Sequence, residues 1–135
     1  MTNKNGPRLV PAMAKRPCAF HISVVFLLLL SVYALTSPRT VALEDDGLFI
    51  LSAYFNGVSH PPGYPLYTLI GKLFTFLPIS SIAYRVHLAS AVFGAATCAI
   101  LWWVVHTISR DKYAAYVAAL ALGVSPIFWS QSIVA

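Results

Sequence analysis

Residues 47–71 read GLFILSAYFNGVSHPPGYPLYTLIG and contain no Asp, Glu, Lys or Arg. The segment is long and apolar enough to cross a membrane, which takes about 20 mostly apolar residues in a helix. Its middle, however, holds Pro61, Pro62, Gly63 and Pro65. Proline removes a backbone donor and disfavours helix at the residue before it, and broken backbone in lipid leaves polar groups without partners. The segment therefore predicts two short helices joined by a rigid turn at the membrane surface.

The half of this segment that follows the turn predicts an amphipathic helix, because its apolar and polar side chains fall on opposite faces at helical spacing. The apolar face holds Leu66, Leu69, Ile70, Leu73 and Leu77, and the polar face holds Tyr67, Thr68, Gly71, Lys72 and Thr75. A helix of this kind lies in the plane of the membrane interface.

Three further charge-free windows predict transmembrane helices. Hydrophobic residues make up 59% of the chain and charged residues 10%, whereas a soluble domain carries roughly 25% charged residues. We therefore expect an all-α integral membrane protein with spans at residues 18–36, 85–108 and 113–130. A cleaved signal peptide is the alternative for the first window, but its apolar stretch is longer than the roughly 7–15 residues of such peptides.

The predicted spans carry small residues at the spacing that lets helices approach closely in lipid. Ser90, Gly94 and Cys98 recur every four residues in the second span, and Pro126 is expected to kink the end of the third. Three helices with such faces have few partners among themselves. We therefore expect the chain to be a fragment of a larger bundle.

Basic residues before the first span place the N-terminus in the cytoplasm, because such flanks mark the cytoplasmic side. The predicted order is a cytoplasmic segment at 1–17, an extracytoplasmic loop at 37–84, a cytoplasmic turn at 109–112 and a further extracytoplasmic segment from 131 to 135. An arrangement with four spans places as many basic residues inside, so the prolines rather than the charges favour three. The sequence lacks a basic patch interleaved with aromatic residues, so it does not indicate nucleic-acid binding.

The predicted extracytoplasmic loop opens with Glu44, Asp45 and Asp46, and His60 precedes its double proline. Adjacent carboxylates raise one another's pKa, which suits a general base; a solvated cap beyond a helix end is the simpler interpretation. Asp45, Asp46 and His60 are also candidate ligands for a divalent metal, although no spacing is diagnostic of one. The sequence identifies no cofactor with certainty, and a divalent metal is the one candidate.

Two basic residues of the same region are candidates for binding a phosphate. Arg85 has the planar fork that suits a phosphate, or it extends to the membrane interface as long basic side chains do. Lys72 is the weaker candidate because it projects from the polar face of an amphipathic helix.

A family resemblance runs from about residue 40 to residue 135 and covers roughly 70% of the chain. HPPGYPL (60–66), followed by AYRVHL (83–88) and later by FWSQSIVA (128–135), resembles the bacterial multipass proteins related to the eukaryotic endoplasmic-reticulum O-mannosyltransferase that acts on plexin-type receptor domains. Those proteins belong to the GT-C class of membrane glycosyltransferases. The resemblance implies transfer of a sugar from a polyprenyl-phosphate donor to a hydroxyl of a protein or glycan acceptor, in a periplasmic loop of a bacterial inner-membrane protein.

The resemblance also implies roles for individual residues. Asp45 matches the catalytic aspartate of an Asp-Ser-Gly-Glu pattern, but Asp46 replaces its Ser and Leu48 its Glu, so Glu44 or Asp46 is expected to supply any second carboxylate. His87 stands where asparagine is common. The expected substrate-binding residues are His60, Tyr64, Arg85 and Lys72. The fragment is expected to be inactive alone; the alternative function is a non-catalytic membrane subunit or a transporter fragment.

Overall fold

A computed structural model describes residues 15–42, 44–61 and 63–135, without the side chains of residues 15–17 and 44. Most of the predicted cytoplasmic segment, residues 1–17, lies outside the described residues. The described part of the chain is all-helical, with no strand. Its helices are α1 (Lys15–Thr36), α2 (Glu44–Phe55), α3 (Pro65–Thr75), α4 (Ile82–Ser109), α5 (Lys112–Gly123) and α6 (Pro126–Ser132).

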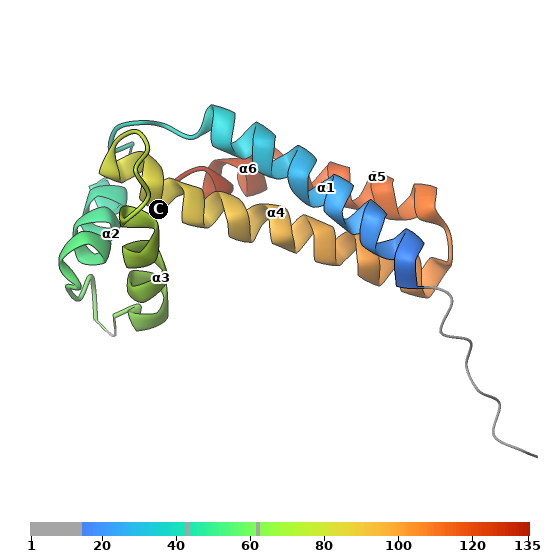
Figure 1. The fold of residues 1–135 in the computed structure, drawn as a ribbon, viewed down its shortest axis with the longest axis horizontal. Helices are drawn as coiled ribbons and strands as arrows, with labels where there is room; N and C mark the ends of the chain where they lie inside the picture. The colour runs from blue at the N-terminus through green and yellow to red at the C-terminus, as the bar shows by residue number, and fades with distance from the viewer. Residues whose placement is uncertain (1–14, 43, 62) are drawn as a thin grey trace, which may run out of the picture.

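The helices α1, α4 and α5 lie side by side and form an elongated bundle, with α6 packed near one end of it (Figure 1). Two helices in the described residues are long and apolar enough to cross a membrane, and they are Cys18–Thr36 and Ile82–Ser109. The pair α5 and α6 passes the same test only together and is bent by 68°, as in a broken span or a re-entrant loop. The kink predicted at Pro126 is therefore present.

Local sequence explains how α4 and α5 begin and end. The Ser81 side chain accepts a hydrogen bond from the Tyr84 N–H at the start of α4, as an N-cap does. The helix ends where Arg110 adopts a left-handed conformation with φ of 57°. Asp111 then caps α5, because its Oδ1 accepts from the Tyr113 N–H at 2.8 Å. The predicted hairpin at 109–112 is thus a tight turn between two capped helices.

Small residues hold the bundle together, and of the predicted row Ser90, Gly94 and Cys98 the last two are buried. The core of α4 is made of Ala91, Ala95, Cys98, Ala99 and Trp102, which pack against Val25, Leu29 and Tyr33 of α1 and Ala115 and Ala119 of α5. Tyr33 also donates a buried hydrogen bond to the Gly123 carbonyl at 2.8 Å. In lipid, burial of apolar surface contributes little to the association of helices. Such close packing and hydrogen bonding supply the association energy instead.

The segment 47–71 folds as two short helices, as its prolines predicted. Helices α2 and α3 lie together at one end of the bundle and run across the long axis of α4 (Figure 1). They approach closely because Gly71 has no side chain: a Cβ there would lie 2.9 Å from the Ala53 Cβ. The chain's last residue, Ala135, lies at this same end of the molecule (Figure 1).

Helix α3 presents its apolar face outward and its polar face to the protein. Thr68, Gly71 and Thr75 are buried against α2 and α4, whereas Leu66 is 71% exposed and Leu73 66%. Leucines in such a row need an apolar neighbour. The predicted position of α3 at the membrane interface would supply one, and that position stays a prediction.

Candidate active site

The acidic triplet forms the first turn of α2, where negative side chains are favoured because the helix N-terminus is positive. Successive residues of a helix point about 100° apart, so Asp45 and Asp46 face different surroundings. Asp46 is buried and Asp45 is exposed. The side chain of Glu44 lies outside the described residues, so its predicted catalytic role stays a prediction.

Asp46 has a buried side chain and takes part in a network of hydrogen bonds. Its Oδ2 accepts from the Ala42 N–H at 2.7 Å, and its Oδ1 accepts from the Ala135 N–H at 3.0 Å. The same Oδ1 lies 2.8 Å from Nε2 of His87, with the two side chains 1% and 0% exposed. On the other side of the ring, His87 Nδ1 lies 2.9 Å from the Pro38 carbonyl oxygen.

Asp45 faces outward and lies beside the histidine of the proline-rich turn. Its Oδ1 is 3.4 Å from His60 Nε2, and the two side chains are 78% and 56% exposed, respectively. The fold thus brings together two residues that are 15 positions apart in the sequence, on one exposed surface. Their catalytic and binding roles stay predictions.

Sequence patterns do not predict the contact between Asp46 and His87, although the family resemblance contains a sign of it. The family resemblance implies a serine at the position of Asp46 and an asparagine at the position of His87. Both departures therefore meet in space, at a distance of 2.8 Å. Two unusual polar residues at positions of a shared pattern are a hint of such a contact.

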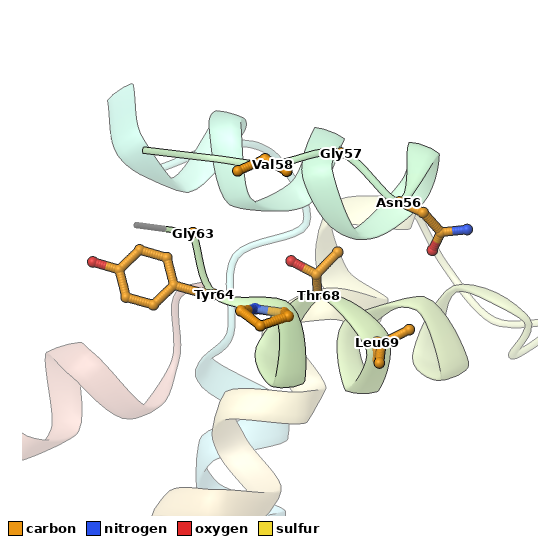
Figure 2. Close-up of a pocket in the computed structure, with 8 residues that line it drawn as sticks. Asn56, Gly57, Val58, Gly63, Tyr64, Thr68 and Leu69 are labelled. Carbon is orange, nitrogen blue, oxygen red and sulfur yellow. The ribbon is translucent and has the colours of Figure 1, made fainter. Parts of the chain in front are cut away.

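The turn that carries His60 borders a cavity of about 310 Å³. The backbone turns at Gly63, whose φ of 82° suits glycine and whose N–H donates to the His60 carbonyl. Figure 2 shows Thr68 pointing from α3 toward the segment that carries Gly57 and Val58. The cavity is lined by Asn56, Gly57, Val58, Gly63, Tyr64, Pro65, Thr68 and Leu69.

A second cavity, of about 440 Å³, lies on the other side of the start of α3, toward α4. Tyr64 borders both cavities and is 48% exposed, so it remains a candidate for contact with a substrate. Tyr67 and Phe93 help to line the second one. Burial raises the pKa of Tyr67 above its ordinary value, which keeps its phenol neutral and able to donate a hydrogen bond.

The two basic residues singled out in the sequence bind backbone carbonyls. Arg85 donates from Nε to Ile79 at 2.6 Å, from Nη1 to Thr75 at 2.9 Å and from Nη2 to Ser80 at 3.1 Å. Lys72 Nζ donates to the Tyr54 carbonyl and lies 5.1 Å from the centre of the Tyr54 ring. Their predicted contacts with a substrate stay predictions.

A metal site finds no support in the donor set of the described residues. Asp45 and His60 lie together, but Asp46 points to a separate buried site. Among the residues that the structure describes, no group of three or more His, Cys, Asp and Glu side chains is arranged to hold a metal ion.

Arg85→Ala is expected to destabilise the protein by about 1–2 kcal/mol, because three backbone carbonyls, one at the end of α3 and two in the loop after it, lose a charged donor. Arg85→Lys should recover little, since a single ammonium cannot match the guanidinium fork. Thermal unfolding in detergent measures the effect, with Arg39→Ala, at an exposed arginine, as the control. An unchanged unfolding temperature for Arg85→Ala would contradict the structural role.

Comparisons with known proteins agree with the family resemblance. The family model of the "Protein O-mannosyl-transferase TMEM260 N-terminal domain" matches residues 45–135. Protein O-mannosyl-transferase TMEM260 of Mus musculus is 39% identical over 112 residues, which are 82% of this chain and 16% of the relative. Protein O-mannosyl-transferase tmem260 of Dictyostelium discoideum is 29% identical over 118 residues, which are 83% of this chain and 14% of the relative. No solved structure matches.

These relatives are named as transferases, and the chain spans about one sixth of their length. The match begins at Asp45, so it contains that residue together with His60, Arg85 and His87. It also contains α2 from its second residue onward, α3, the long helix α4 and the bent pair α5 and α6. The chain belongs to the protein O-mannosyltransferase TMEM260 family, and its residues 45–135 correspond to the N-terminal domain of that family.

Proposed function

We propose that this chain is the N-terminal part of a GT-C-type membrane O-mannosyltransferase. In this proposal the enzyme takes a sugar from a polyprenyl-phosphate donor and transfers it to an acceptor hydroxyl, on a protein or a glycan, outside the cytoplasm. The observation that carries the proposal is the exposed pair of Asp45 and His60, which lie 3.4 Å apart at the start of α2 in a chain of this family.

The position of this pair suits a donor that is anchored in lipid. Helices α2 and α3 lie at one end of the bundle that α1 and α4 form (Figure 1). If α1 and α4 cross the membrane, that end lies at the level of the lipid headgroups, where the phosphate of such a donor lies. The proposed arrangement puts residues 37–84 on the extracytoplasmic side and residues 109–112 in the cytoplasm. In a bacterial inner membrane the extracytoplasmic side is the periplasm.

The proposed reaction is a single displacement at the anomeric carbon of the sugar. Asp45 takes the proton of the acceptor hydroxyl while the oxygen forms a bond to that carbon. The bond between the carbon and the phosphate oxygen breaks, and its electrons leave with the polyprenyl phosphate. A displacement in one step inverts the configuration of the anomeric carbon.

The leaving phosphate gains negative charge and needs donors close by. Lys72 has three ammonium protons, of which one binds the Tyr54 carbonyl. Arg85 adds positive charge near the end of α3. In the proposal His60 binds the acceptor or orients Asp45, and Tyr64, at the edge of both cavities, contacts the sugar.

The proposal is tested by a transfer assay in membranes that contain the full-length protein. We expect mannose to reach a protein acceptor from a polyprenyl-phosphate donor and not from a nucleotide-linked one. Membranes that lack the protein are the control for background transfer. Equal transfer from both donors would reject the lipid-linked donor, and no transfer from either would favour the alternative of a non-catalytic membrane subunit.

A further inference from the structure

We propose that Asp46 and His87 form a positioning pair for the proposed active site. They fix the first turn of α2 against α4, so that the neighbouring Asp45 is held on the outer surface beside His60. The inference rests on the proposed function for its activity test, but its geometric basis is independent of it. Neither Asp46 nor His87 is accessible to a substrate, since their side chains are 1% and 0% exposed.

The hydrogen bonds specify where the protons of the pair lie. A carbonyl oxygen only accepts, so the 2.9 Å contact with Pro38 requires a proton on His87 Nδ1. The 2.8 Å contact between Nε2 and Asp46 Oδ1 requires one more proton between the two side chains. That proton makes either an imidazolium facing a carboxylate or an imidazole facing a carboxylic acid. The pair has no net charge in either form, which keeps the cost of burying it low.

The pair connects segments that are far apart in the sequence. Asp46 binds the N–H groups of Ala42, in the linker after α1, and of Ala135, beyond α6. His87 belongs to α4 and binds the carbonyl of Pro38. The first turn of α2 is thus held from three sides at the residue next to Asp45. Few other contacts can set the direction of Asp45, because that side chain is 78% exposed.

A displacement of a reacting group by about 1 Å costs on the order of 100-fold in rate. We therefore expect Asp46→Ala and His87→Ala to lower kcat by about 100-fold each, with the KM for the lipid-linked donor unchanged. The double variant should have about the same kcat as the less active single variant, because the two side chains act as one unit. Transfer is measured in the full-length protein, at equal amounts of membrane-inserted protein.

Asp46→Asn separates positioning from proton transfer and guards against misfolding of the alanine variants. The amide can donate to Nε2 of neutral His87 while its oxygen accepts from the Ala42 N–H, so most of the network survives. We expect this variant to keep transfer within about 10-fold of the unmodified protein, since only the hydrogen bond with the Ala135 N–H is lost. Asp45→Asn, the matched control, should lower transfer by about 10²–10⁴-fold. If Asp46→Asn is as inactive as Asp45→Asn, then Asp46 takes part in proton transfer and the inference is wrong.

A second readout does not depend on activity. A nitroxide label is attached to a cysteine at position 45, or at position 51 further along α2 as the control, in a protein without Cys18 and Cys98. We expect His87→Ala to increase the mobility of the label at position 45 and not at position 51. Unchanged mobility at both positions, or increased mobility at both, would overturn the inference.

The two readouts also distinguish failure of the inference from failure of the proposed function. An unmodified protein without transferase activity would reject the function, and the nitroxide labels would still decide on the positioning role. An active protein in which Asp46→Ala and His87→Ala transfer sugar within twofold of the unmodified protein would reject the positioning role and leave the function standing.

Discussion

Asp45→Asn is expected to lower sugar transfer by about 10²–10⁴-fold, the range that a general base contributes. The amide has nearly the shape of the carboxylate but cannot accept the proton of the acceptor hydroxyl. Because the Asp45 side chain is 78% exposed and its one described side-chain contact, with His60, is 3.4 Å long, its loss should cost little stability. The loss of sugar transfer should therefore appear in kcat, while membrane insertion and the unfolding temperature stay unchanged.

The matched control is Asp111→Asn, at the opposite end of the bundle. Asp111 caps α5 by accepting from the Tyr113 N–H, and asparagine caps helices about as well as aspartate. This variant should insert and transfer sugar normally. Retained activity in Asp45→Asn would mean that another residue is the base, and Asp46 and Glu44 would be tested next.

Gly94→Val is expected to destabilise the protein by about 3 kcal/mol, at the upper end of what overpacking costs. At Gly94, Ser132 of α6 and Tyr33 of α1 both come close to α4. A Cβ at this position would lie 2.5 Å from the Ser132 Oγ, 2.7 Å from the Ser132 Cβ and 3.3 Å from a ring carbon of Tyr33. Because the obstacle includes atoms close to the backbone of α6, that helix must move away from α4.

Unfolding in mild detergent, by heat or by added denaturing detergent, measures this effect. The matched control is Gly57→Val, where the nearest atom to a Cβ is the Ser52 Cα at 3.5 Å, an ordinary contact. Surface changes of this kind are usually worth less than about 0.5 kcal/mol. Ser132→Gly should recover part of the stability that Gly94→Val loses, because it removes the obstructing side chain. Equal losses for Gly94→Val and Gly57→Val would contradict the packing argument.

The positions of the helices could be predicted from short-range rules. The prolines at 61–65 divide an apolar segment in two because proline cannot continue a helix, and Pro126 bends the last apolar window for the same reason. The small residues around Gly94 mark a contact face because only small side chains allow close approach in lipid. The family was also accessible, because its pattern is continuous in sequence.

The orientation of the elements could not be predicted in the same way. Amphipathic spacing separates the two faces of α3 but does not say which one meets protein, and the packing buries its threonines while Leu66 and Leu73 point outward. The sequence predicts that Arg85 binds a phosphate or reaches the membrane interface, and that stays a prediction. It does not indicate that Arg85 donates to the carbonyls of Thr75, at the end of α3, and of Ile79 and Ser80, in the loop that follows.

The candidate site shows the same division most clearly. Composition and local pattern place carboxylates at 44–46, a histidine at 60 and another at 87. They do not say that Asp46 is buried against His87 while Asp45 faces His60. That choice depends on how α2 is rotated against α4, and the rotation is set by contacts between residues some 40 positions apart or more, including the Ala135 N–H. The conformational preferences of short segments carry no information about such contacts. Only the packing of the whole chain determines them.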